Sequence, residues 1–259
     1  MTSAPPWESL LLRPLRRSHV VQFASDDDFR AEAFTRFVGA GIRGGEAVVV
    51  SCLPHRWRDV ARRLASDGVD VVRAEREGEL LLFDPEATLP QLLVDGSPDA
   101  AAFEKTIDPV VAELRLRFST LRVCGEMVDL LWQRGDRDGA LRLEHLWSDL
   151  QRRAPLELFC SYSLDLLRDD AYDGPIDAIC RSHSHVIPTR HYDRLDEAVM
   201  RASAEVLDLP LAHMMRSLSA SHRPETEMPF GQATLLWLKE NMPITAAKVL
   251  DGVRRRVEG

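Results

Sequence analysis

Long apolar stretches are missing from this chain of 259 residues. No run of about 18 residues is free of charged side chains, whereas a membrane-spanning helix needs about 20 predominantly apolar residues. The N-terminal segment "MTSAPPWESLLLRPLRR" also lacks the apolar core and the small-residue cleavage site of a secretory leader. These absences exclude the class of membrane-spanning proteins and predict a cytoplasmic protein.

An excess of positive charge is missing as well. The 41 Asp and Glu residues outnumber the 33 Lys and Arg residues, so the formal net charge is -8. Binding along a nucleic acid needs a basic face, and the only dense basic run beyond the N-terminal segment is Arg254–Arg256. We therefore expect no direct binding to nucleic acid.

Cysteines and catalytic sequence motifs are also scarce. The cysteines are widely spaced, and we expect them to be reduced: Cys52, Cys124, Cys160 and Cys180. Three of them lie in or directly after strand-like runs, where a small apolar thiol packs well. There is no G-x-S-x-G sequence, and no cysteine lies in a setting that would activate it, so nucleophilic catalysis is disfavoured.

Short apolar runs that alternate with amphipathic helical patterns make up most of the chain. Strands are expected at 19–24, 46–52, 69–74, 79–84 and 156–162, with another that begins at residue 121 and breaks at Cys124-Gly125. Helices are expected at about 28–41, from Pro54 onward, and at 86–93, 99–117 and 138–153. This alternation predicts a three-layer α/β domain with a mainly parallel sheet that is covered on both faces.

The chain changes character after residue 183, where helical periodicity continues without a strand-like run. We expect a flexible N-terminal arm over 1–16, the α/β domain over 17–187 and an all-α extension over 188–259. The polar segment 219–229, "SASHRPETEMP", is expected to be an exposed linker. The next segment is densely apolar and predicts a homodimer or partner surface: Leu235, Leu236, Trp237 and Leu238.

The turn after the second strand, "SCLPHRWRD", is where a nucleotide-binding α/β protein would place its phosphate loop. Such a loop needs flexible glycines and a lysine followed by Ser or Thr, and none of these is present. His55 and Arg56 are the cationic groups nearest the turn. ATP hydrolysis is therefore disfavoured, although a small anion could still bind at this helix start.

Two glutamates stand out as candidate site residues. Glu126 begins a helix directly after a buried strand, at the sheet edge where open α/β folds bind ligands, but an acid at a helix start is also favourable by itself. Glu144 lies on the apolar stripe of helix 138–153. A carboxylate on an apolar stripe needs a partner, which could be a structural group such as an arginine or a ligand.

The sequence "CRSHSHVIPTRH" holds residue types that bind transition metals: Cys180, His183, His185 and His191. Their C-x2-H-x-H-x5-H spacing matches no pattern that geometry justifies, and a histidine pair beside a proline turn is more often structural. A metal site is therefore the minor alternative for this segment.

Several of these sequences occur in the order and spacing of one known family. The chain resembles the MEDS domain, the sensory domain named after a dichloromethane-responsive regulator, in "HVVQFASDDDF", "GIRGGEAVVVSCLPHRW", "LRVCGEMVDLLWQRGD", "ALRLEHLWSDL" and "LELFCSYSLD". The resemblance covers about residues 17–187, and "GEMVDLLW" followed by "LEHLW" is its most specific part.

The resemblance implies a RecA-like α/β fold with a degenerate phosphate loop. It also implies a sensing role in proteins that regulate transcription or two-component signalling, with small hydrocarbon derivatives as the proposed signals. Members usually carry a DNA-binding or histidine-kinase region, but this chain shows neither kinase motifs nor a helix-turn-helix. The helical extension is therefore expected to serve dimerisation or docking onto a regulatory partner.

The leading interpretation is a non-catalytic sensor, without a cofactor, that binds a small organic molecule at the C-terminal edge of its sheet. The residues expected to line that site are Ser51, His55, Glu126, Glu144, Trp147 and Tyr162. Two alternatives stay open. One is a divergent nucleotide-dependent, ATPase-like enzyme with Glu126 as general base, and the other is a metal-dependent sensor that uses the cysteine and histidines of "CRSHSHVIPTRH".

Overall fold

The computed structural model describes residues 6–172, 174–219 and 226–257. Its main sheet has six parallel strands in the order β3-β2-β6-β7-β1-β8. The strands are β1 His19–Phe23, β2 Ala47–Ser51, β3 Leu80–Phe83, β6 Leu121–Gly125, β7 Glu157–Tyr162 and β8 His185–Ile187. The central strands are buried on both faces, which explains their continuous apolar runs. The predicted fold class is confirmed.

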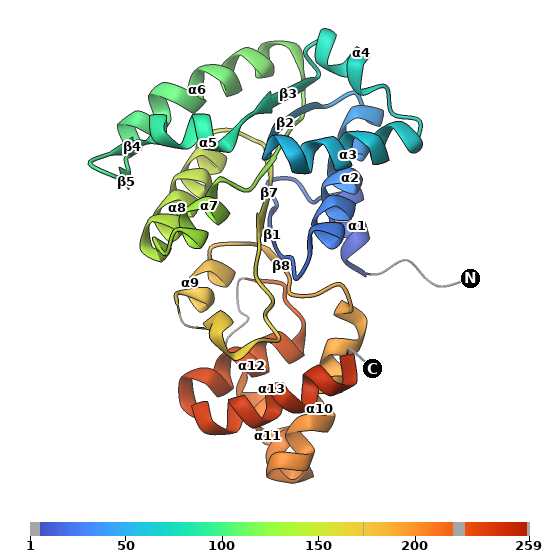
Figure 1. Ribbon diagram of the computed structural model, residues 1–259, viewed down its shortest axis with the longest axis vertical. Coiled ribbons are helices and arrows are strands. Elements are labelled where there is room, and N and C mark those ends of the chain that lie inside the picture. The colour runs from blue at the N-terminus through green and yellow to red at the C-terminus, as the bar shows by residue number, and fades with distance from the viewer. Residues whose placement is uncertain (1–5, 173, 220–225, 258–259) are drawn as a thin grey trace.

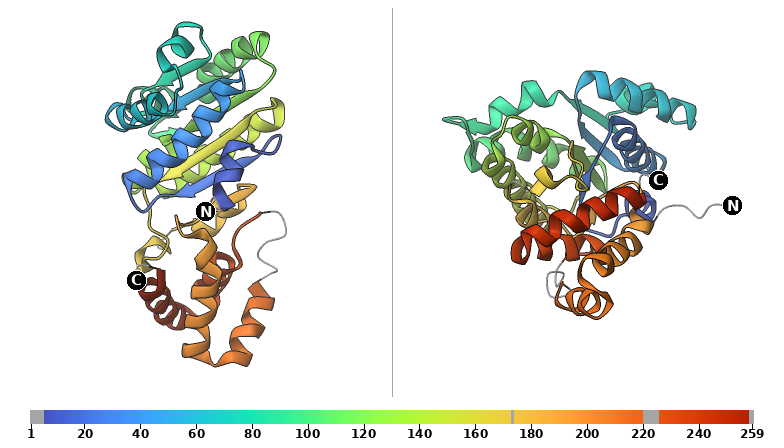
Figure 2. Two further views of the ribbon diagram at one scale, coloured as in Figure 1. Left: turned by 90° about the vertical axis from the view of Figure 1, so that its right-hand side faces the viewer. Right: turned by 60° about the horizontal axis from the view of Figure 1, so that its bottom comes forward.

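Helices cover both faces of this sheet (Figures 1 and 2). One face carries α1 Pro6–Leu12, α2 Asp27–Arg43, α3 Pro54–Ser66 and α4 Val71–Arg76. The other carries α5 Pro85–Thr88, α6 Ala100–Arg117, α7 Met127–Gln133, α8 Arg137–Arg153 and α9 Ile176–Arg181. Smaller elements are η1 Leu89–Leu92, η2 Asp169–Tyr172 and the antiparallel pair β4 Leu93–Val94 and β5 Ser97–Pro98.

Aspartate side chains begin several of these helices, and one of them overturns a prediction. Asp26 accepts the backbone N–H of Phe29 at the start of α2. Asp70 accepts the N–H of Arg73 in the same way and starts α4. The prediction of a strand over 69–74 was therefore wrong, because this cap outweighs the strand propensity of the valines.

The N-terminal segment from residue 6 is packed against the sheet layer, in contrast to the flexible arm expected there. Trp7 and Leu11 of α1 are completely buried, and the Trp7 ring meets Phe29 edge-on with centroids 5.3 Å apart. Buried Arg122 of β6 donates to the carbonyl of Leu11 at 2.9 Å. Side-chain burial and this hydrogen bond hold α1 in place.

The C-terminal helices are α10 Tyr192–Leu207, α11 Leu209–Ser219, α12 Phe230–Asn241 and α13 Pro243–Val257. They share a hydrophobic core of their own and gather beyond one end of the sheet (Figure 1). The expected absence of strands after residue 183 was wrong, because β8 pairs with β1 as an edge strand. Within the described part of the chain, no helix combines the length and the apolar character needed to span a bilayer.

Two expectations about this region need correction. Leu235, Leu236 and Leu238 are buried inside the chain, and Trp237 packs against the core of the C-terminal helices, so these residues are not an exposed partner surface. Of the expected linker 219–229, residues 220–225 lie outside the described part, whereas Thr226 and Met228 are buried. Thr226 donates to the carbonyl of His183 at 2.9 Å, which fixes this end of the segment against the sheet domain.

Candidate functional site

Charged side chains gather where β1, β2, β6 and β7 end. The connections that leave β1 and β2 lead toward the β3 edge of the sheet, whereas those that leave β6 and β7 lead toward the β8 edge. Open α/β sheets bind ligands in the crevice that such a reversal leaves at the carboxyl ends of the strands. A cleft of about 690 Å³ opens here, between the start of α2 and the segment after β7.

Glu126 lies at this edge and is held from two sides. It follows Gly125, the last residue of β6, and is completely buried at the start of α7. Its Oε1 accepts the backbone N–H of Leu53 at 2.6 Å, and its Oε2 accepts a guanidinium N–H of Arg56 at 2.6 Å. The chain's own carboxylate thus occupies the turn before α3, where a phosphate loop would hold an anion.

Asp129 continues the same network one helical turn later. It accepts the backbone N–H of Ser163 at 2.8 Å and the side-chain amide of Gln133 at 3.1 Å. Buried Arg30 of α2 donates to the Ser163 hydroxyl at 2.5 Å and lies 3.7 Å from Asp129. Both buried carboxylates and Arg30 are therefore paired inside the chain, as buried charges require.

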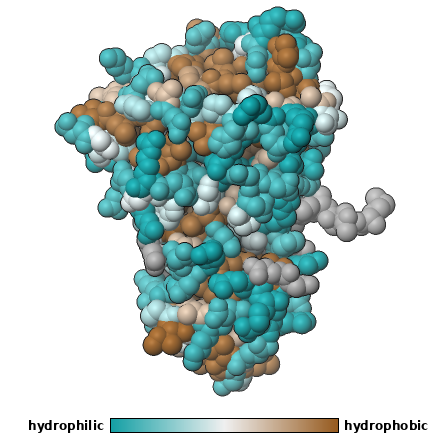
Figure 3. Space-filling view, viewed as in Figure 1, coloured by the Kyte–Doolittle hydropathy of each residue, from teal (hydrophilic) through white to brown (hydrophobic). Residues whose placement is uncertain are grey.

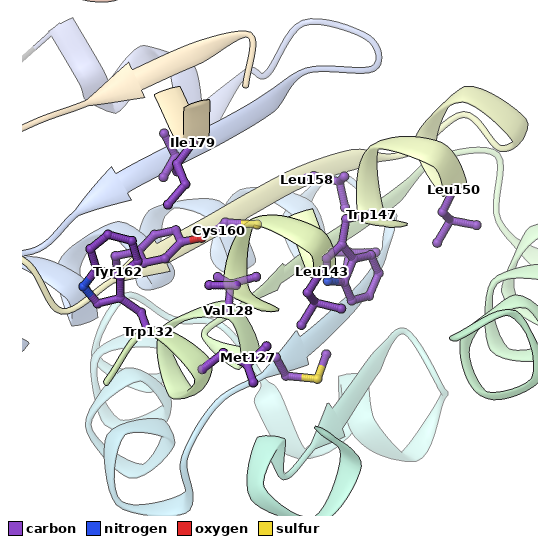
Figure 4. Packing of buried hydrophobic residues seen from close by; sticks show 14 of the residues in the cluster. Met127, Val128, Trp132, Leu143, Trp147, Leu150, Leu158, Cys160, Tyr162 and Ile179 are labelled. Carbon is purple, nitrogen blue, oxygen red and sulfur yellow. The ribbon is translucent and has the colours of Figure 1, made fainter. Parts of the chain in front are cut away.

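A second cavity lies between one face of the sheet and the helices α6, α7 and α8. Its volume is about 40 Å³ and its lining is almost wholly apolar. Figure 4 shows Val128, Trp147 and Leu158 converging there from α7, α8 and β7. Ser51, the last residue of β2, lines the same cavity, and its buried hydroxyl has no hydrogen-bond partner among the described residues.

A buried polar cluster surrounds Glu144 on α8. Glu144 is completely buried, and its Oε1 accepts the hydroxyl proton of Tyr162 at 2.8 Å. Its Oε2 lies 3.2 Å from Sγ of Cys160 and 3.4 Å from Nε2 of both His19 and His183. The sequence analysis expected a partner for this carboxylate, such as an arginine. The structure pairs it, within the described part of the chain, with a mixed set of side chains that contains no arginine. All the groups in this cluster are of the kinds that bind protons or metal ions.

Burial and neighbouring charge set the protonation of this cluster. Burial, assisted by nearby His183, lowers the pKa of His19 to about 4, so His19 is neutral at neutral pH. Burial alone would raise the pKa of Glu144. Its interactions with His183 and His19 outweigh this effect and hold that pKa below its ordinary value. Burial also raises the pKa of the Cys160 thiol well above its usual range.

The six residues expected to line one pocket are distributed over three places. Ser51 and Trp147 line the apolar cavity. Glu144 and Tyr162 belong to the buried cluster, which adjoins that cavity through Cys160. Glu126 lies in the arginine network, and exposed His55 lies at the start of α3 beside Arg56. A ligand role for each of the six stays a prediction.

The expected metal set is also divided. His183 faces Glu144, but His185 pairs with Glu227 at 3.2 Å and His191 is exposed at the start of α10. Among the described residues, the group with metal-binding side chains close together is instead His19, Glu144, Cys160 and His183.

A family model agrees with this architecture. Residues 18–184 match the model described as "MEthanogen/methylotroph, DcmR Sensory domain", abbreviated MEDS. The chain belongs to the MEDS family. The predicted resemblance is thereby confirmed, and membership gives the chain a sensory role in signalling. The MEDS match begins beside His19 and ends beside His183, so it spans the whole buried cluster and stops before α10–α13. No curated protein matches the chain closely enough to be compared with it.

Sequence reasoning missed His19, Cys160 and Arg30. One available signal was that Cys160 and Tyr162 are two residues apart on a strand and therefore share a face. His19 and His183 carry no such signal, because β1 and the segment before β8 meet only through the pairing of the strands.

Proposed function

We propose that this chain is a non-catalytic sensor that binds a small organic molecule, mainly apolar and with one polar group, in the cavity beside Ser51 and Trp147. The observation that carries this proposal is the cavity itself. It is almost wholly apolar, and one buried hydroxyl without a partner points to a ligand that could supply one. An unpaired buried hydroxyl is unfavourable, so a ligand that bonded it would gain free energy.

The cavity also limits the size of the ligand. A volume of about 40 Å³ accommodates about three water-sized groups, because each needs about 10–15 Å³. Molecules with about three non-hydrogen atoms, such as dichloromethane or ethanol, are therefore the appropriate probes. This size agrees with the small hydrocarbon derivatives suggested for the family.

The larger cleft at the strand ends is a weaker candidate for the same role. Arg30 and Arg56 are already paired with Asp27 and Glu126, so a ligand there would have to compete with internal ion pairs. A nucleotide is disfavoured by the same argument, because the Glu126 carboxylate takes the N–H and the guanidinium that would meet a phosphate.

Signalling would pass through the helical extension to a second copy of the chain or to a regulatory protein. In support, α11 exposes Leu209 and Met214, each more than half accessible to solvent. Figure 3 shows apolar patches over these C-terminal helices, at the bottom of the view, and further apolar patches over the upper part of the molecule.

Filling the cavity tests the binding site. Val111 of α6 lines it, and Val111→Ile adds one methyl group to the lining. We expect dichloromethane and ethanol to raise the melting temperature of the wild type and to raise that of Val111→Ile much less. The filled variant itself should be more stable by up to about 1 kcal/mol, because a buried methylene contributes about 0.8 kcal/mol.

Val60→Ile provides the matched control, because buried Val60 lies on α3 across the sheet from the cavity. It should keep the response to both probes. A wild type that responds to neither probe in the millimolar range, or a Val111→Ile variant that responds like Val60→Ile, would contradict the proposed site.

A further inference from the structure

We infer that His19, Glu144, Cys160 and His183 form a buried zinc site that fastens the segment before β8 to the core of the sheet. The four residues come from the start of β1, from α8, from β7 and from the segment after α9. Each offers one ligand atom, and all four atoms lie within 4.8 Å of one another.

The spacing of these atoms fits tetrahedral coordination. Two ligand atoms bound to one zinc ion at about 2.0–2.3 Å lie about 3.3–3.6 Å apart at the tetrahedral angle. Glu144 Oε2 is 3.4 Å from both histidine Nε2 atoms and 3.2 Å from the Cys160 sulfur, which in turn is 3.4 Å from Nε2 of His19. Small side-chain shifts would therefore complete the coordination shell.

Hydrogen bonds on the far side of His183 and Glu144 orient these two side chains. Nδ1 of His183 lies 2.7 Å from the carbonyl of Ile179, so this nitrogen carries the proton. Its Nε2 is buried, has no hydrogen-bond partner among the described residues and lies 3.4 Å from Oε2 of Glu144. In the neutral imidazole this nitrogen carries a lone pair, and a cation between it and the carboxylate would be bound by both. The hydroxyl of Tyr162 donates a hydrogen bond to the other carboxylate oxygen of Glu144, Oε1.

The donor set and its charge favour zinc. One thiolate, two imidazoles and one carboxylate are the ligands of tetrahedral zinc sites, and softer or harder donor sets select other metals. With the thiolate and the carboxylate ionised, the ion and its ligands are neutral in sum, which a fully buried site requires. Four protein ligands leave no open position, so the site is structural and not catalytic.

The test is metal analysis of the full chain without an affinity tag, expressed in zinc-supplemented medium. We expect about one zinc ion per chain. After exchange for Co²⁺, we expect an intense thiolate-to-cobalt charge-transfer band and visible bands of tetrahedral intensity. A metal content well below one per chain together with no cobalt spectrum overturns the inference, and so does a cobalt spectrum without the thiolate band.

Matched variants separate this site from the other cysteine and histidines nearby. Cys160→Ser and His183→Gln should each lower the bound zinc at least tenfold. Cys180→Ala and His185→Gln remove side chains that are equally buried but lie outside the four, and they should retain it. Loss of zinc from the two controls would overturn this ligand set. If the first pair fails to fold, the cobalt spectrum of the wild type still decides.

Discussion

The pairing of Arg56 with Glu126 gives a sharp prediction about stability. Arg56→Met keeps the aliphatic stem but removes the guanidinium that donates to completely buried Glu126 at 2.6 Å. Breaking a buried ion pair on one side costs about 3–5 kcal/mol. Two features reduce this figure, because the Arg56 side chain is 19% exposed and Arg30 remains 3.8 Å from the same carboxylate. We expect a loss of about 2–3 kcal/mol in the free energy of unfolding.

The measurement is urea unfolding at neutral pH, followed by circular dichroism. Arg62→Met is the control, because Arg62 lies on the same helix and also pairs with an aspartate, Asp59, but is 76% exposed. Surface pairs of this kind contribute about 0–1 kcal/mol. A double-mutant cycle with Glu126→Gln should show coupling of more than about 1 kcal/mol between residues 56 and 126. The reasoning is refuted if Arg56→Met is as mild as Arg62→Met, or if the two changes at 56 and 126 are simply additive.

Two further predictions concern acid and self-association. In chelator-treated protein, the pKa of His19 is about 4 when folded and 6.5 when unfolded, so the unfolded chain binds more protons between these values. Stability should therefore fall by up to about 3 kcal/mol as the pH drops from 6.5 to 4. His19→Gln should flatten this slope in urea titrations, and an equally steep variant would contradict the assignment. If α11 mediates a homodimer, light scattering should show the wild type as a dimer and Leu209→Glu/Met214→Glu as a monomer. Ile244→Glu, which alters an exposed side chain of α13, should stay dimeric, whereas a monomeric wild type would rule the homodimer out.

Much of the α/β layering could be predicted, because a parallel strand that is buried on both faces has a continuous apolar sequence. The valine runs of β1 and β2, the break after Cys124 and the apolar stripe of α8 all have the structure that their periodicity indicates. Predictions failed where a short local signal competed with a longer one. Asp70 turned a valine-rich run into α4, and β8 is too short for its alternation to be visible against the helical pattern that follows.

The candidate site shows the same division. The sequence by itself determined that Glu144 lies on a buried face and needs a partner, and that Glu126 begins a helix at the edge of the sheet. Only the tertiary structure decided which partners they have. Glu126 meets Arg56 because α3 and α7 begin at neighbouring strand ends, and Glu144 meets His19 and His183 because β1 lies between β7 and β8. Periodicity records which face of an element is buried, whereas the order of strands in the sheet fixes which residues meet there.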